Sequence, residues 1–198
     1  MPRSKNPAVP ARSAPGRIRI IGGRLRGSKI DVAQSPGLRP TSDRLRETLF
    51  NWLQPWIDGA RCLDLFAGSG ALGIEAWSRG AAAVVLVERD SALASGIDDN
   101  LQRLHMPGTV KCMSATDFLG QPAEAFDIVF VDPPFALSCW SEVAQRLEQG
   151  DWLADSALIY LESPRDTVID VAANWRLLRE TAAGSVRALL YQRQARLR

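Results

Sequence analysis

The sequence predicts an α/β fold built on a mostly parallel, seven-stranded sheet. Short apolar segments alternate with longer helical patterns from residue 61 onward, as expected for strands joined by crossover helices. A glycine-rich turn at residues 67–73 follows the first of these apolar segments. The 198 residues are enough for one such domain and a short appendage, and they contain no sign of a second core.

The composition is that of a globular domain with a basic front segment. Hydrophobic residues make up 46% of the chain and charged residues 23%. Residues 1–60 carry 11 Lys and Arg against 4 Asp and Glu, whereas residues 61–198 carry 13 against 18. This asymmetry indicates a polyanionic partner held at one end of the molecule. No apolar segment reaches the roughly 20 residues that a membrane span needs, so we expect no membrane partner.

The cysteines and the histidine do not suggest a metal site. Cys62, Cys112 and Cys139 lie far apart in the sequence, and His105 is the only histidine. We therefore expect no bound metal, and three buried thiols in the reducing cytoplasm.

The chain before the sheet divides into two parts. Residues 1–16 are rich in Pro, Ala, Ser and Arg and lack the apolar core of a secretory signal, so we expect a disordered basic arm. Residues 17–40 predict a basic β-hairpin extension, with strands at 18–21 and 29–32 and a mobile Gly/Arg turn between them.

Basic side chains of this extension are candidates for binding RNA phosphates. A phosphate contact needs positive charge rather than a fixed groove, which suits a glycine-rich turn. The candidates are Arg24, Arg26, Lys29 and Arg39.

The domain proper, residues 41–198, begins with a helix. Thr41 or Ser42 can cap it, with Asp43 in the first turn. Its apolar stripe consists of Leu45, Leu49, Trp52 and Leu53. Arg44 and Arg46 lie off this stripe, so they are either surface charges or groups that bind RNA or a cofactor.

The remaining elements follow in strand–helix order. We expect strands at residues 62–66, 83–87, 109–113, 126–131 and 157–161. We expect helices at residues 71–79, 91–104 and 138–148. Residues 175–180 and 186–192, joined through a glycine turn, predict a C-terminal antiparallel hairpin.

The first strand, the glycine turn and the following helix form a nucleotide-sized pocket. Glycines allow the backbone to approach a ligand closely, and we expect free N–H groups of the turn to face it. Asp64 precedes the glycines at the strand end. A carboxylate there would repel a phosphate but attract a cation or a ribose hydroxyl.

Acidic residues occur at or just past four successive strand ends: Asp64, Glu88, Asp117 and Asp132. Ligands of open α/β sheets bind beyond these ends. A carboxylate in the position of Glu88 can accept hydrogen bonds from both hydroxyls of a ribose. Asp117 can accept from an adenine amine while Phe118 covers a face of the ring.

The segment Asp132-Pro133-Pro134-Phe135 is the sharpest signal in the sequence. Two prolines stiffen the backbone directly after a buried strand, which holds the flanking side chains in place. Phe135 can stack on a planar base, and Asp132 can accept hydrogen bonds from its amine.

These residues resemble a known family. The segment from Asp64 to Gly70 looks like motif I of class I S-adenosylmethionine-dependent methyltransferases, and Asp132 to Phe135 looks like their amine-methylating motif. The order and spacing, with the segments at 22–24 and 39–41, resemble the RsmD family of bacterial 16S rRNA guanine-N2 methyltransferases. The resemblance covers roughly residues 17–192.

The resemblance implies a Rossmann-like methyltransferase fold and methylation of the exocyclic N2 amine of a guanine in 16S rRNA. The cofactor would be S-adenosyl-L-methionine, and the substrate a 30S subunit or an assembly intermediate, bound by a monomeric protein. The implied catalytic residues are Asp132, Pro133, Pro134 and Phe135. The implied cofactor-binding residues are Thr41, Arg44, Asp64, Phe66, Ala67, Gly68, Ser69, Gly70, Glu88, Arg89, Asp117, Phe118 and Asp132.

Other functions fit parts of the sequence. The pattern Gly68-x-Gly70-x-x-Gly73 also matches the dinucleotide fingerprint of nicotinamide-dependent oxidoreductases, although Asp64 would repel a pyrophosphate. The amine could instead be adenine N6 in RNA or DNA, or a protein glutamine. A non-catalytic RNA-binding module would not need an intact Asp132.

Overall fold

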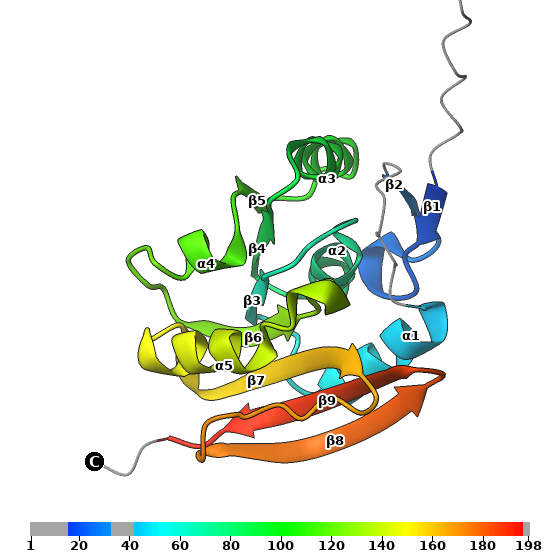
Figure 1. Cartoon of the computed structure of the whole chain (residues 1–198). Coiled ribbons are helices and arrows are strands. Elements are labelled where there is room, and N and C mark those ends of the chain that lie inside the picture. The colour runs from blue at the N-terminus through cyan, green and yellow to red at the C-terminus, as the bar shows by residue number, and fades with distance from the viewer. Residues whose placement is uncertain (1–15, 33–41, 196–198) are drawn as a thin grey trace, which may run out of the picture.

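The computed structural model describes residues 16–32 and 42–195 and confirms the predicted α/β class. Seven strands form one sheet in the order β5-β4-β3-β6-β7-β9-β8 (Figure 1). Their bounds are β3 (Arg61–Asp64), β4 (Ala83–Glu88), β5 (Thr109–Cys112), β6 (Phe126–Val131), β7 (Leu153–Pro164), β8 (Trp175–Ala183) and β9 (Val186–Arg193). Strands β3 to β7 run parallel, and β8 and β9 form the predicted antiparallel hairpin.

Helices cover both faces of the sheet. They are α1 (Asp43–Leu53), α2 (Ala71–Ser78), α3 (Ser91–Arg103), α4 (Ala115–Phe118) and α5 (Trp140–Gln149), with 3₁₀ turns at η1 (Gly23–Leu25) and η2 (Phe135–Leu137). Successive strand residues point to opposite faces. Cys62 and Ile128 therefore pack with α1, α2 and α3, whereas Leu63 and Val129 pack with α4 and α5.

Local sequence explains where most of these helices begin. The Ser42 side chain caps α1 by accepting the Leu45 N–H at 3.3 Å, as one of the two predicted caps. Asp90 caps α3 by accepting from Ala92 and Leu93. The predicted helix at 138–148 begins later, at Trp140, because Ser138 adopts a left-handed φ of 46° that a helix cannot contain.

A buried ion pair fixes the C-terminal hairpin to α5. The Glu148 carboxylate accepts from the Arg193 guanidinium at 2.9 Å and from the Trp175 indole N–H at 2.9 Å, and it also accepts from the amide of Asn174. Although burial alone raises the pKa of Glu148, these hydrogen bonds bring it down to about 2. The hairpin is therefore anchored at the sheet end opposite the glycine turn.

The N-terminal extension forms the predicted hairpin from β1 (Gly16–Arg19) and β2 (Lys29–Val32). Its turn lies against α2, which corrects the expectation of a mobile turn (Figure 1). The Glu75 carboxylate of α2 accepts the N–H groups of Ile21 and Gly22, each at 2.8 Å. These hydrogen bonds fasten the turn to the domain.

The contact between turn and helix is close enough to require glycine. Gly23 has a φ of +74°, and a Cβ there would lie 1.9 Å from the carbonyl oxygen of Ser78. The Ser78 hydroxyl donates to the carbonyl of Gly22 and accepts the N–H of Leu25. The backbone of the turn therefore lies directly on α2.

The sequence left Arg46 open as a surface charge or as a group that binds RNA or a cofactor, but the structure buries it. Only 1% of it is exposed, and its guanidinium donates to the Arg19 carbonyl at 2.6 Å and to Asp43 at 2.9 Å. Burial lowers the pKa of Arg46, and Asp43 and Glu75 counteract that shift. Arg46 is thus a link between α1 and the hairpin.

Two of the three cysteines are not buried as the sequence predicted. Cys62 is buried as predicted, but Cys112 is exposed and Cys139 is half-buried. Burial raises the pKa of Cys62, so this thiol stays protonated.

Across residues 16–32 and 42–195, no helix combines the length and the apolar character that crossing a bilayer requires.

Candidate active site

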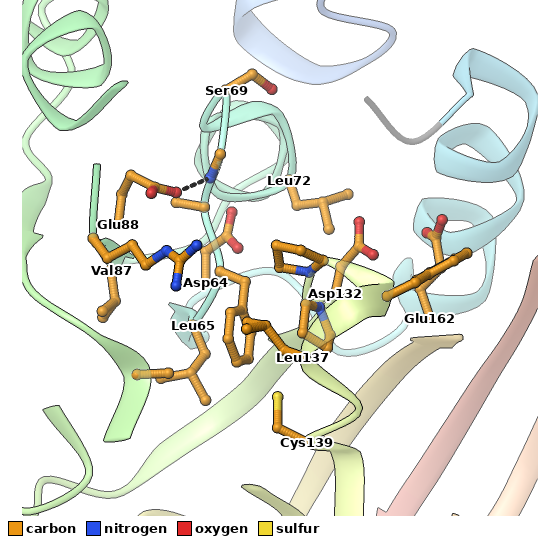
Figure 2. Close-up of a pocket in the computed structure, with 18 of the residues that line it drawn as sticks. Asp64, Leu65, Ser69, Leu72, Val87, Glu88, Asp132, Leu137, Cys139 and Glu162 are labelled. Atoms are coloured by element: carbon orange, nitrogen blue, oxygen red, sulfur yellow. Dashed lines mark hydrogen bonds between the residues drawn. The ribbon is translucent and has the colours of Figure 1, made fainter. Parts of the chain in front are cut away.

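A cavity of about 680 Å³ opens at the carboxyl ends of the parallel strands (Figure 2). Its walls come from the ends of β3, β4, β6 and β7 and from the loop after β5. Open α/β sheets bind ligands at this end of their strands. The volume of the cavity suits a nucleoside-sized molecule and leaves space for a second group next to it. Many residues predicted for the site line it: Asp64, Phe66, Ala67, Gly68, Ser69, Glu88, Arg89, Asp132, Pro133, Pro134 and Phe135.

Asp64 places a buried carboxyl group at the start of α2. Its side chain is only 2% exposed and accepts the N–H of Gly73, in the first turn of the helix, at 3.0 Å. A carboxyl group therefore already lies where the helix N-terminus would otherwise attract a phosphate. Burial raises the pKa of Asp64 to about 7, and the nearby Glu88 adds to this, whereas the hydrogen bond from Gly73 opposes it.

This pKa makes the stability depend on pH with a definite sign. The folded protein keeps a proton on Asp64 until about pH 7, whereas the unfolded chain releases it near pH 4. The contribution of Asp64 to stability is therefore complete below about pH 4 and is lost as the pH rises to about 7.

Asp64→Asn removes this titration and keeps an oxygen for the Gly73 N–H. We expect its free energy of unfolding, relative to wild type, to rise between about pH 5 and pH 7 by up to about 1.4 kcal/mol per pH unit. Urea unfolding at several pH values measures this difference. A difference that stays constant with pH would contradict the assignment.

The sequence predicted that N–H groups of the glycine turn face a ligand, but two of them are hydrogen-bonded within the protein. Gly68 donates to Glu88 at 2.8 Å, and Gly70 donates to the Ala67 carbonyl at 2.6 Å. Glu88 also accepts the Asp90 N–H at 2.8 Å, so each of its oxygens holds one backbone hydrogen bond and keeps a further lone pair. The Gly68 N–H thus orients Glu88, and neither this group nor the Gly70 N–H is offered to an anion.

The Asp-Pro-Pro-Phe segment forms the wall across from the glycine turn. Asp132 directly follows β6, and its carboxyl group points into the cavity in Figure 2. Pro134 leads into η2, and the Phe135 ring lies 6.1 Å from that of Trp140. The Phe135 ring therefore packs against the start of α5 at the rim of the cavity.

Three predicted cofactor residues lie elsewhere. Phe118 is buried in the core with its ring 4.8 Å from that of Trp152, so it cannot cover a base. Asp117 accepts from the Ser114 hydroxyl at 2.7 Å, and the loop lines the cavity through Met113 to Thr116 instead. Arg44 is exposed on α1.

Two corrections follow from how these segments fold. The loop after β5 turns into α4, which directs Phe118 inward, and α1 reaches the cavity through Ser42 and Leu45 rather than through Arg44. Gly70 is the left-handed N-cap of α2, with a φ of 77°, and does not line the cavity. Thr41 and Arg39 lie outside the described residues.

The sequence analysis did not identify Glu162 as an acidic residue of the cavity wall. Glu162 is only 6% exposed, lies on β7 and lines the cavity beside the Asp-Pro-Pro-Phe segment (Figure 2). Glu162 directly follows the strand predicted at residues 157–161, so the criterion that singled out the other acids, a carboxylate at a strand end, applies to it as well. In the described parts of the chain, no group of three or more His, Cys, Asp or Glu could hold a metal ion.

Comparisons with known proteins decide the family. The model of the family described as "Conserved hypothetical protein 95" matches residues 18–192. An Escherichia coli K12 protein named ribosomal RNA small subunit methyltransferase D is 52% identical over 94% of this chain and 95% of its own. The chain belongs to the RsmD family.

Further relatives of the RsmD family agree with this assignment. A Haemophilus influenzae protein of the same name is 44% identical over 91% of this chain and 96% of its own. The solved structure of yhhF from Escherichia coli superimposes with a TM-score of 0.86 at 50% identity, covering 91% of this chain and all of that one. The cofactor of this methyltransferase is S-adenosylmethionine, so the cavity has to accommodate that molecule.

Proposed function

We propose that this protein transfers the methyl group of S-adenosylmethionine to the N2 amine of a guanine in small-subunit rRNA. The observation that carries the proposal is one cavity with the glycine turn and Glu88 on one side and Asp132 on the other. The names of the most similar relatives support the RNA substrate.

The charges of the cavity suit a cofactor with a sulfonium and no phosphate. Glu88 can accept from ribose hydroxyls with its remaining lone pairs, since its backbone hydrogen bonds fix its orientation. Asp64 occupies the helix N-terminus, so a dinucleotide pyrophosphate would meet a carboxyl group there. This argues against the oxidoreductase alternative.

Asp132 has the chemistry needed for an exocyclic amine. When bound, S-adenosylmethionine supplies a methyl group that is already activated, so the protein mainly has to align the amine with it. The guanine amine is a weak nucleophile because its lone pair is delocalised into the ring. As an acceptor, Asp132 would orient the amine and stabilise the positive charge that develops on its nitrogen, while Phe135 can stack on the base.

The target guanine must leave any helix in which it is paired, because a stacked amine cannot enter the cavity. We infer that the substrate is the 30S subunit or an assembly intermediate, that the protein acts as a monomer in the cytoplasm, and that the basic hairpin holds the flanking RNA. Arg24, Arg26 and Lys29 are exposed, and the Arg24 guanidinium lies 4.1 Å from the Trp77 ring centroid.

The hairpin contacts predict a salt-dependent affinity. Replacing both Arg26 and Lys29 with Ala should weaken RNA binding and reduce the slope of log K against log salt by about 1.5. The matched control, Arg176→Ala with Arg179→Ala, removes two exposed charges from β8, at the far edge of the sheet (Figure 1). Filter binding from low to moderate salt measures both slopes. Equal losses in the two double variants would contradict the role of the hairpin.

Mass spectrometry of rRNA nucleosides from cells with and without this protein tests the proposed function. We expect N2-methylguanosine at one small-subunit position to disappear without it and to return with the wild-type gene. Loss of N6-methyladenosine instead would favour the alternative target.

A further inference from the structure

The most informative feature outside the described motifs is a second carboxylate beside Asp132. Val131 of β6 and Leu161 of β7 are register partners, so Asp132 and Glu162 occupy the next level of two neighbouring parallel strands. Partner residues of parallel strands point to the same face. Figure 2 shows the two carboxyl groups directed the same way at the cavity wall.

Glu162 is held in place by buried donors. The Tyr160 hydroxyl donates to its carboxylate at 2.9 Å, and the Trp140 indole N–H donates to its backbone carbonyl at 2.7 Å. Tyr160 itself is fully buried. Burial and the charges of Glu162 and Asp132 raise the pKa of Tyr160 well above its usual value, so the phenol remains a donor.

We propose that Glu162 determines the choice of guanine by accepting the N1–H of the base while Asp132 accepts the adjacent N2 amine. This inference rests on the proposed function. Guanine presents two neighbouring donors, N1–H and N2–H, and a pair of acceptors matches them. Adenine presents an amine beside an unprotonated N1, whose lone pair would face a carboxylate. The pair therefore accepts guanine and rejects adenine.

A modified substrate tests this without altering the protein. In 2,6-diaminopurine the N2 amine remains but N1 carries a lone pair instead of a hydrogen. We expect wild-type protein to methylate small-subunit particles carrying this base at the mapped target with a kcat/KM at least about a hundredfold below that for guanine. Equal rates on the two bases would overturn the inference.

Glu162→Gln supplies the complementary change. The oxygen of the introduced amide can accept from Tyr160, and its nitrogen can donate to the lone pair on N1. We expect the guanine rate to fall and the preference for guanine over 2,6-diaminopurine to shrink by tenfold or more. An unchanged preference would overturn the role of Glu162. The matched control, Glu124→Gln, changes an exposed Glu that pairs with Arg61 at the start of β3, the strand end opposite the cavity, and should leave the preference intact.

A second variant covers the case in which Glu162→Gln does not fold. Tyr160→Phe keeps the buried ring but removes the donor to Glu162, and we expect a several-fold loss of the same preference. Melting temperature and S-adenosylmethionine affinity identify variants that are merely unfolded. Failure of the proposed function can be distinguished from failure of this inference, because wild-type protein would then yield no N2-methylguanosine at all.

Discussion

Replacing Asp132 with Asn is expected to lower kcat for methyl transfer about a thousandfold. Asn keeps the shape of the side chain but loses the negative charge that stabilises the amine as its nitrogen becomes positive. The affinity for S-adenosylmethionine should stay within a few-fold of wild type, since Glu88 and the glycine turn remain intact. Single-turnover assays and calorimetry measure the two quantities.

The control for this prediction is Asp155→Asn. Asp155 is 89% exposed at the opposite end of β7 and pairs only distantly with Arg193, at 3.5 Å. This variant should retain wild-type activity. Near-normal activity of Asp132→Asn would remove the proposed role of that residue, and a large loss of cofactor affinity would place it in cofactor binding instead.

The second large effect is expected on stability. Glu75 is 1% exposed and accepts from Arg79 at 2.8 Å as well as from the hairpin turn. Glu75→Ala leaves Arg79 and two backbone N–H groups without this acceptor, next to the buried Arg46. We expect the free energy of unfolding to fall by about 3–5 kcal/mol. Urea unfolding measures the change.

Release of the hairpin should accompany that loss. Trypsin should cut Glu75→Ala after Arg24 or Arg26 faster than it cuts wild type, because the turn no longer lies fixed on α2. Glu124→Ala removes an exposed ion pair and should change stability by less than about 1 kcal/mol. Similar losses in both variants would show that Glu75 does not hold the hairpin.

Features encoded by neighbouring residues were predictable. The strands of the sheet are recognisable as apolar segments bounded by glycine and proline. The turn at Asp132 to Phe135 was also predictable, because the strand before it and the two prolines in it are adjacent in the sequence. The cavity-lining residues of the glycine turn follow from the same kind of pattern.

Features that depend on packing between distant segments were not predictable. The burial of Arg46 was not predicted because its acceptor, the Arg19 carbonyl, comes from the hairpin 27 residues earlier. The turn looked mobile because nothing near it in sequence indicates Glu75. Phe118 looked like a base-stacking ring because a loop and a short helix cannot be distinguished over four residues, and that helix turned it into the core.

Methyl transfer with isotopically labelled S-adenosylmethionine tests the central claim most directly. Small-subunit particles from cells lacking the protein are incubated with purified enzyme and labelled cofactor, and the RNA is digested to nucleosides. We predict that the label is recovered in N2-methylguanosine. Label recovered in N6-methyladenosine, or no transfer by a protein that binds the cofactor, would contradict the claim.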